Sequence, residues 1–463
     1  MDTIWHPDLL QNGIAKYRAL LDAIHNALNT GQISHGDRLL PVREMAWRLQ
    51  VTPGTVARAY QLGIDEELLE AHVGRGTFIR TPKPETARKT TVFGETHVSP
   101  DIIDLRNAAV PDFGQDEILD DLSKQIEIGG EHSMVRYAGH NEMPTRTAML
   151  DWMQLERTRA KPEDLILTYG SQNATIAAFM AILRGTNPVI ATDTLVLPGT
   201  RRAAELARAK IIGIEGDEDG ILPKAFEDIC RRDRPQILHL SANITNPTAI
   251  QMSLTRKAKI AEIARQYDLQ IVEDDGQAKF FATPPPSFLE LCPERVWHVS
   301  SLSRYLAAGL RIGFLLCPPG KGMIGQNVIQ SLCHSFSPLI AQLATHFIQS
   351  GQADIILEQI RTYRAERVRL AVNQLGCWDI RWNEAADYLW LNLPNPWRAS
   401  TFSAAAEKTG ILVAPADIFL PDDGVAPNAI RLTLGGKYGA RIFQEALVRL
   451  DHLLDNPPHE MLA

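Results

Sequence analysis

The side chain of Arg304 limits the possible functions of this chain more than that of any other residue. It lies in the stretch Val299–Phe314. A guanidinium keeps a pKa above about 12 in proteins and has no free amine lone pair. It therefore cannot act as a nucleophile, or as a general base near neutral pH. Two roles remain open: its planar fork binds an anion directly, or the side chain fills volume and pairs with Asp274 or Asp275.

The composition of the chain indicates an ordinary globular protein. The 463 residues carry a formal net charge of −8, and 45% are hydrophobic and 22% charged, which predicts about two to four domains. The net acidity argues against indiscriminate binding of polyanions, but a local basic surface remains compatible with it. The first residues lack a basic region followed by an apolar run, so we expect a cytoplasmic protein without a signal peptide.

Two patterns concern cysteine chemistry and membranes. The five cysteines are scattered and show no CxxC or His–Cys metal spacing, which predicts reduced thiols and no metal site. Residues 331–353 contain no Asp, Glu, Lys or Arg, but their serine, histidine and glutamine side chains are too polar for a membrane-spanning helix. We therefore predict a buried or interface helix there, and no membrane partner.

The N-terminal part of the chain predicts three helices followed by a hairpin. Residues 14–30 have helical apolar spacing, and a second helix is predicted over 41–49. A third helix begins at Thr52 and Pro53, because Thr52 can cap it and Pro53 suits its first turn. Residues 68–79 have the pattern of a hairpin with a glycine-rich tip. This order of elements is the outline of a winged helix-turn-helix.

The whole chain predicts an α/β protein of four segments. We expect the winged helix-turn-helix over 1–80 and a linker over 81–101, where three prolines and several threonines lack an apolar period. Short β-rich runs then alternate with amphipathic stretches, which predicts a mostly parallel sheet with helices on both faces over 102–345. A helix-rich segment with two further apolar runs predicts a smaller α+β domain over 346–463.

Three segments of the predicted winged helix-turn-helix resemble the signature of the GntR family of DNA-binding proteins: Gly36–Ala46, Val51–Tyr60 and Gly74–Phe78. The resemblance covers residues 14–80. In such modules the recognition helix enters the major groove of double-stranded DNA with its N-terminal residues near base edges. Pro53 departs from the pattern, because many family members carry arginine there, so we expect one direct contact to be missing.

The resemblance implies DNA contacts from two helices. Thr52 and Thr55 would contact phosphate or bases at the start of the recognition helix. Arg43 would reach the backbone or a groove from the preceding helix, and Arg58 would lie along the recognition helix. The alternative for such arginines is a solvated charged face without a DNA contact.

The glycine-rich wing implies a further contact. Arg75 would enter the minor groove, and Gly74 and Gly76 would allow the backbone to approach the DNA closely. Because residues 1–80 have a net charge near zero, such a DNA-binding face depends on segregation of charge and not on bulk basicity.

Residues 104–450 resemble the aminotransferase-like domain of MocR-type GntR regulators, which has the fold of fold-type I pyridoxal-phosphate (PLP) proteins. The stretch around Arg304 resembles their segment Ser-x-Ser-Lys followed by Gly-Leu-Arg-x-Gly, whose lysine forms a Schiff base with the cofactor. Arg304 stands at the position of that lysine. Lys279 lies near Asp274 in the sequence, but its place after a strand end makes it a poor replacement. The resemblance thus implies a PLP-type site without a covalent anchor.

Several positions that hold PLP in such domains are retained. Gly170, Ser171 and Gln172 follow a predicted strand and open a helix, where backbone N–H groups cradle a phosphate. Asn246 would bond the phenolic oxygen of the cofactor. Asp274 would hold the pyridine nitrogen protonated, which makes PLP an electron sink.

Four further positions complete the implied pocket. Arg311 would bind the cofactor phosphate with help from Ser301 and Ser303. Arg431 would grip a ligand carboxylate in a bidentate fork. Together these residues imply a pocket for a small anionic or amino-acid-like effector, in which PLP would be held without a covalent bond.

Other positions depart from the family pattern. Gly276 stands where a tyrosine is usual, and Leu197 stands where an aromatic ring would stack on the pyridine. Ala249 replaces a glycine. Together with Arg304, these losses favour ligand sensing over catalysis.

The sequence therefore predicts a DNA-binding transcriptional regulator, with a homodimeric aminotransferase-like domain that senses a ligand. Two alternatives remain open. The first is a PLP-dependent aminotransferase with an accessory DNA-binding domain, which needs a lysine to move protons. The second is a DNA-binding dimer with a vestigial ligand site. We expect no catalytic residue and no metal.

Overall fold

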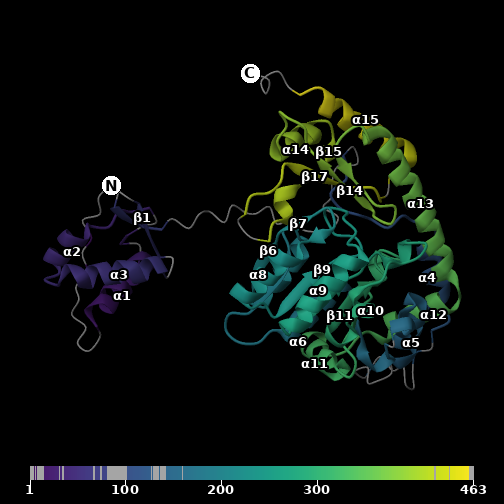
Figure 1. The fold of residues 1–463 in the computed structure, drawn as a ribbon, viewed down its shortest axis with the longest axis horizontal. Helices are drawn as coiled ribbons and strands as arrows, with labels where there is room; N and C mark the ends of the chain where they lie inside the picture. Colours follow the sequence, from purple (N-terminus) through teal and green to yellow (C-terminus); the bar gives the residue numbers. More distant parts are fainter. Residues whose placement is uncertain are drawn as a thin grey trace. The chain divides into compact units, whose positions relative to one another are not determined.

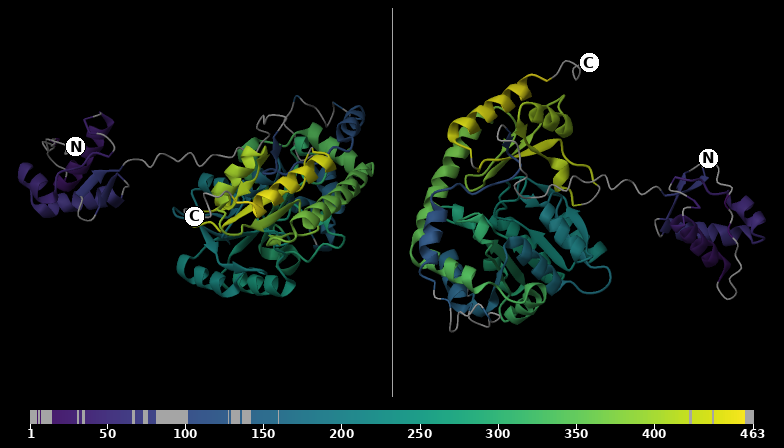
Figure 2. Two further views of the ribbon diagram at one scale, coloured as in Figure 1. Left: turned by 90° about the horizontal axis from the view of Figure 1, so that it is seen from above. Right: turned by 180° about the vertical axis from the view of Figure 1, so that it is seen from behind.

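The structure is a computed structural model with two compact units, Met1–Phe93 and Gly94–Ala463, drawn in Figures 1 and 2. The segment 81–101, predicted as a linker, lies outside the described residues. The structure describes residues 5, 7, 15–30, 32–33, 36–65, 68–72, 76–80, 102–126, 128, 135, 142–158, 160–421, 424–436 and 438–457.

The N-terminal unit consists of three helices and an antiparallel strand pair: α1 (Lys16–Asn29), α2 (Val42–Arg48), α3 (Pro53–Asp65), β1 (Leu69–His72) and β2 (Gly76–Ile79). Leu20 and Ile24 on α1 and Val56 and Tyr60 on α3 are buried against each other, so each helix presents one apolar stripe. The Tyr60 hydroxyl donates to Leu40 O (2.9 Å), which satisfies a polar group inside this core. The predicted helices and hairpin are confirmed, and their order is that of a winged helix-turn-helix.

A seven-stranded sheet forms the centre of the second unit. In spatial order its strands are β4 (Leu165–Thr168), β12 (Gly313–Leu316), β11 (Val296–Ser301), β10 (Gln270–Asp274), β9 (Ile237–Leu240), β5 (Val189–Asp193) and β6 (Lys210–Ile214). Strand β12 runs antiparallel to both of its neighbours, and the other pairs are parallel. The predicted mostly parallel sheet is confirmed, because the apolar runs of the sequence coincide with its buried strands.

Helices cover both faces of this sheet (Figure 1). One face packs against α6 (Ser171–Ile182), α7 (Pro198–Leu206) and α11 (Gly322–Cys333). The other packs against α4 (Gln115–Ser123), α5 (Met143–Met153), α8 (Pro223–Asp233), α9 (Leu254–Gln266), α10 (Phe288–Leu291) and α12 (Pro338–Gln349). Side chains alternate along each strand, so Val272 belongs to the first core and Ile271 to the second. Polar side chains at the strand ends therefore point toward opposite faces.

A second, antiparallel sheet lies in the C-terminal part of the unit, with strand order β13 (Ile380–Arg381), β14 (Tyr388–Asn392), β17 (Ala429–Thr433) and β16 (Ala414–Pro415). Its core includes side chains of α13 (Gln352–Leu375), α14 (Ala399–Lys408) and α15 (Ala440–Asp455). Strand β3 (Ile103–Asp104) pairs in parallel with β15 (Ile411–Leu412). Strands β7 (Gly216–Asp217) and β8 (Gly220–Ile221) form a small antiparallel hairpin.

The buried helix predicted at 331–353 is found as α12, but it is shorter than that range, because the structure divides the segment. Helix α11 ends at Cys333 and α12 begins at Pro338, where the Ser337 side chain accepts a hydrogen bond from Ile340 N (3.5 Å). Proline at the first helical position favours a new start and not a continuation. In the described part of the chain, no helix is long and apolar enough to cross a membrane.

Candidate DNA-binding surface and ligand pocket

The N-terminal end of α3 presents two threonines, of which Thr52 is exposed and Thr55 is half-buried. The Thr52 side chain accepts a hydrogen bond from Thr55 N (3.3 Å), and the two hydroxyl oxygens lie 2.9 Å apart. Thr52 therefore caps the helix that begins at Pro53, as predicted. Because helix N-termini carry partial positive charge, this end of α3 suits contact with a phosphate.

The arginines of the two central helices lie on the surface in different settings. Arg43 on α2 is exposed. Arg48 pairs with Glu44 one turn away (2.8 Å). Arg58 on α3 is exposed and lies 4.3 Å from the ring centre of Tyr17, a cation–π contact that holds it against α1. Arg43 is thus directed to solvent, whereas Arg58 is partly fixed by its own unit.

Part of the predicted wing is described. Gly76 has a φ of +112°, which L side chains rarely adopt, and a Cβ there would lie 2.9 Å from Arg38 Nε. Glycine at this position therefore leaves room for the Arg38 guanidinium beside the strand. Gly74 and Arg75 lie outside the described residues.

Two consecutive aspartates end β10 in different environments. Burial raises the pKa of Asp274 to about 6, although the charge of Arg304 acts against the shift. Asp274 lines a space of only about 10 Å³ together with Asn246. Asp275 instead accepts a hydrogen bond from Asn243 Nδ2 (2.8 Å). Only the first aspartate therefore belongs to the predicted pocket.

Arg431 and Asn246, 185 residues apart in the sequence, are brought together. Arg431 Nη1 donates to Asn246 Oδ1 (2.8 Å), and the arginine is only 3% exposed. Its guanidinium lies 4.8 Å from the ring centre of Phe419. Burial lowers the pKa of Arg431 to about 10, and the charge of Arg304 acts in the same direction. Among the described residues, Arg431 Nε is buried without a hydrogen-bond partner, so it can donate to a ligand.

Arg304, which is half-buried, forms an ion pair with the buried carboxylate of Asp387, which directly precedes β14. Arg304 Nη1 lies 2.9 and 2.6 Å from the two carboxylate oxygens, and Arg364 Nη2 on α13 donates to the same group (3.3 Å). Gln277 Nε2 lies 3.4 Å from it. Burial alone would raise the pKa of Asp387, but the charges of Arg304 and Arg364 outweigh it and hold the pKa below its ordinary value. One carboxylate is thus shared by two guanidinium groups.

This pairing corrects the expectation that Arg304 pairs with Asp274 or Asp275. Asp275 bonds to an asparagine, and Asp387 comes closer because the start of β14, an inner strand of the C-terminal sheet, lies against the turn that carries Arg304. Asp387 lies 83 residues further along the chain, so no local pattern identifies it as the partner. The available signal was a charged residue at the start of the apolar run Tyr388–Leu393.

Arg311 and the start of α6 lie together. A Cβ at Gly170 would lie 2.6 Å from Arg311 Nη2, and that nitrogen donates to Tyr169 O (3.3 Å). Glycine at 170 therefore allows the guanidinium to approach the helix N-terminus. Gln172 Nε2 donates to Gly199 O (2.7 Å), which ties the first turn of α6 to α7.

The serines after β11 approach the same helix start. Ser301 is opposite Gly313 across the β11–β12 pair, and a Cβ at Gly313 would lie 2.9 Å from Gly170 Cα. Ser303 Oγ is buried and has no hydrogen-bond partner within the part of the chain that the structure describes. Ser171 begins α6 itself. These groups and Arg311 fit a phosphate, which accepts several hydrogen bonds.

The pocket fits part of PLP better than the whole. Asp274 suits the pyridine nitrogen, and the α6 start suits the phosphate, but Leu197 lines the space beside Asp274 where a stacking ring was expected. A Cβ at Gly276 would have only Asp274 and Arg304 side chains nearby. The Lys279 ammonium donates to Trp152 O and lies 4.2 Å from the Trp152 ring centre, which leaves it unsuited to anchor the cofactor.

Fold and site together define a winged helix-turn-helix unit fused to an aminotransferase-like unit. Residues 100–440 match the aminotransferase class I and II family, and residues 16–79 match the bacterial regulatory proteins of the gntR family. The chain therefore belongs to the class I and II aminotransferase family, as a GntR-type DNA-binding regulator in which such a domain follows the helix-turn-helix.

Known proteins share this arrangement. The HTH-type transcriptional regulator YdeF of Bacillus subtilis is 26% identical over 98% of this chain and 97% of its own length. The probable rhizopine catabolism regulatory protein MocR of Rhizobium meliloti is 24% identical over 78% of this chain and 77% of its own. The solved structure of LysN, an α-aminoadipate aminotransferase of Thermus thermophilus complexed with N-(5'-phosphopyridoxyl)-L-leucine, has a TM-score of 0.68 and 21% identity, over 78% of this chain and 93% of that one. The fold is thus one associated with PLP, and these regulators carry it beside a DNA-binding unit.

Proposed function

We propose that this chain is a transcriptional regulator whose aminotransferase-like unit binds a small anionic or amino-acid-like ligand and pairs into a homodimer. Arg304 carries the proposal. It occupies the position at which PLP enzymes of this fold need a lysine, and its guanidinium is bound to Asp387. It can neither form a covalent bond with the cofactor nor move a proton near neutral pH. The unit therefore senses its ligand and does not transform it.

The charge balance of the pocket supports an anionic ligand. Three guanidinium groups, those of Arg304, Arg364 and Arg431, act on the single carboxylate Asp387. Asp274 and Asp193 line the space beside Asn246, and burial raises their pKa values to about 6 and about 7, so both carboxyl groups are partly neutral in mildly acidic solution. An anion in the pocket would offset this surplus of positive charge.

PLP, held without a covalent bond, is one candidate ligand. When bound it supplies an electron-withdrawing pyridine ring. Asp274 would hold a proton on the ring nitrogen, Asn246 would orient the phenolic oxygen, and Arg431 would bind the carboxylate of an amino-acid-like ligand. The phosphate would be held by the α6 start and the turn after β11: Gly170, Ser171, Gln172, Ser301, Ser303 and Arg311.

The DNA-binding unit is proposed to act through its exposed helix ends and wing. Support comes from the exposed Arg43 and from the capped N-terminus of α3. A homodimer would carry two such units and would fit two half-sites in an operator. The proposed contacts are Arg43, Thr52, Thr55, Arg58, Gly74, Arg75 and Gly76. The proposed segments are 1–80, 81–101, 102–345 and 346–463.

Addition of PLP to the purified chain tests the central claim. We expect a saturable change in absorbance or heat, and no increase in mass after borohydride reduction. The matched variant Arg304→Lys has an amine lone pair at this position and should gain a reduced, covalent adduct. An adduct on the unmodified chain, or turnover of an amino acid, would contradict the proposal and favour the aminotransferase. Absence of any response to PLP would point to another anionic effector.

A further inference from the structure

A cavity of about 200 Å³ lies on the face of the seven-stranded sheet opposite Asp274. Asp275 and His298 line it. The His298 ring stacks 6.1 Å from Phe314, a member of the core beneath α5 and α9. By contrast, His239 lines the space beside Asp274 and contacts the core on the α6 face. The sheet therefore separates two sites, and the cavity is much the larger enclosed space.

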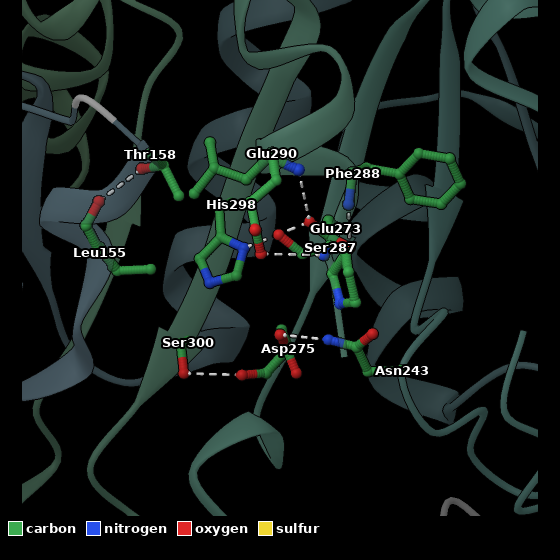
Figure 3. A network of polar contacts seen from close by, with 12 residues as sticks. Leu155, Thr158, Asn243, Glu273, Asp275, Ser287, Phe288, Glu290, His298 and Ser300 are labelled. Carbon is green, nitrogen blue, oxygen red and sulfur yellow. Dashed lines mark hydrogen bonds and ion pairs between the residues drawn. The ribbon is translucent and has the colours of Figure 1, made fainter. Parts of the chain in front are cut away.

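One wall of this cavity is a buried hydrogen-bond network (Figure 3). His298 Nδ1 lies 3.4 Å from Glu273 Oε2, and Glu273 also accepts hydrogen bonds from Phe288 N (2.9 Å) and Leu289 N (3.2 Å). Burial alone would lower the pKa of His298, but the Glu273 carboxylate outweighs it and raises the pKa. The other ring nitrogen, Nε2, lies on the side of the ring away from Glu273 (Figure 3), and it is a donor when the ring is protonated.

Two further cations border the cavity. Lys279 lines it from the short helix η3 (Ala278–Phe280), and Arg361 lines it from α13. Arg361 Nε donates to Lys279 O (2.9 Å), which fixes both residues in the wall. Among the described lining residues Asp275 is the carboxylate, and burial raises its pKa. Glu273 balances the charge of His298, and Arg361 also pairs with Glu358 (3.2 Å), so the surplus of positive charge in the lining comes from Lys279.

Gln154, Thr158 and Ser287 add neutral polar groups, the remaining lining residues are apolar, and the volume suits a small ring. An engineered apolar cavity of about 150 Å³ accommodates benzene, so the cavity here has room for a ring with one further group. The apolar residues that line it are Met153, Leu155, Ala278, Phe281, Ala282, Pro284 and Pro285.

We propose that this cavity is a binding site for a small carboxylate with an apolar body, of about the size of benzoate. The carboxylate would face His298 and Lys279, and the apolar body would lie against the opposite wall. Charge-assisted hydrogen bonds to a carboxylate are strong where water is excluded. The site is distinct from the pocket of Asp274 and Arg431, and it does not depend on the proposed function.

A ligand in this cavity would contact the framework that holds Arg304. Asp275 O accepts hydrogen bonds from Ser300 Oγ (2.9 Å) and the Tyr305 hydroxyl (3.5 Å). Tyr305 directly follows Arg304. The cavity and the ion pair of Arg304 are therefore connected through one backbone carbonyl and a single turn.

A ligand-observed NMR titration of the full chain with benzoate tests the proposal, with benzyl alcohol as a neutral probe of similar size. We expect saturable benzoate binding, and binding of benzyl alcohol at least about tenfold weaker. His298→Gln removes the positive charge and should weaken benzoate binding by about tenfold or more. Ala278→Leu fills the cavity without removing a charge and should abolish binding. His239→Gln, a buried histidine on the opposite face, is the matched control and should change affinity by less than about twofold.

Thermal unfolding of each variant shows whether it is folded. If His298→Gln does not fold, Ala278→Leu still decides the question. If Ala278→Leu binds benzoate as tightly as the unmodified chain does, the ligand lies elsewhere and the proposal is overturned. The same follows if His239→Gln weakens benzoate binding as much as His298→Gln does. Equal affinity for benzyl alcohol, or no saturable benzoate binding at all, would also overturn it. Because Ala278→Leu alters this cavity and not the pocket of Asp274 and Arg431, benzoate binding that persists in this variant would be assigned to that pocket, so the two proposals can fail separately.

Discussion

The N-terminal unit carries its arginines on the surface, whereas the second unit buries several of them in its pocket. Arg48 and Glu44 form an ion pair with side chains 31% and 45% exposed. Arg304 is also 31% exposed, but its partner Asp387 is only 4% exposed, and Arg364, which shares that carboxylate, is 6% exposed. An exposed pair contributes about 0–1 kcal/mol, because water screens it. A buried pair costs much more to break, because the remaining charge is left without compensation. Surface arginines can thus be exchanged singly, whereas the buried ones depend on one another.

This difference matches two kinds of recognition. DNA is a polyanion that binds and leaves reversibly, and each exposed arginine adds a small, salt-dependent contribution. A small anion is selected instead by a preorganised arrangement of buried charges, whose position is fixed by the packing around them.

The largest expected effect is on the buried ion pair. Asp387→Ala leaves Arg304 and Arg364 without their shared carboxylate and should lower the free energy of unfolding of the second unit by about 3–5 kcal/mol. Glu44→Ala, the matched change at the exposed pair, should cost about 1 kcal/mol or less. Urea unfolding of both variants measures the difference. Equal losses would remove the distinction between the two units.

The next effect concerns the pH dependence of the half-buried carboxyl group Asp274. Its pKa of about 6 in the folded chain exceeds the ordinary value of 3.8, so the folded state keeps its proton to higher pH than the unfolded state. The contribution of Asp274 to stability is therefore greatest below about pH 4 and is lost as the pH rises through 6. The side chain of Asp274→Asn cannot ionise. Between pH 4 and pH 7 the free energy of unfolding of this variant should therefore rise by roughly 1–3 kcal/mol relative to that of the unmodified chain. Urea unfolding at a series of pH values checks this, and a constant difference would contradict it.

The smallest effect is expected at the DNA-binding surface. Arg43→Ala should weaken DNA binding about three- to tenfold. It should also reduce the slope of the logarithm of the binding constant against the logarithm of the salt concentration by about one, because one phosphate contact is lost. Its free energy of unfolding should change by less than about 0.5 kcal/mol. Fluorescence anisotropy at several salt concentrations measures both quantities. Arg265→Ala, at an exposed arginine of the second unit that pairs with Glu294 (2.9 Å), is the control and should leave DNA binding unchanged. An unchanged salt slope in Arg43→Ala would remove this residue from the interface.

Local patterns in the sequence were sufficient for most elements. Thr52 and Pro53 identified the start of α3, because a cap and a first-turn proline act within a few residues. The β-rich apolar runs identified the strands of the large sheet, because a strand buried on both faces is apolar throughout. The helix predicted at 331–353 was too long, because Pro338 begins a new helix, although the proline was visible in the sequence.

Local sequence patterns did not predict the contacts between residues that are far apart in the chain. The sequence alone determined that Arg304 cannot serve as a covalent anchor or a base, since that follows from the chemistry of a guanidinium in any fold. Only the tertiary structure decided that its partner is Asp387, that Arg431 meets Asn246, and that Asp275 turns toward a cavity of its own. The physical reason is that propensity and periodicity act over a few residues, whereas the approach of two buried charges depends on how whole sheets pack against each other.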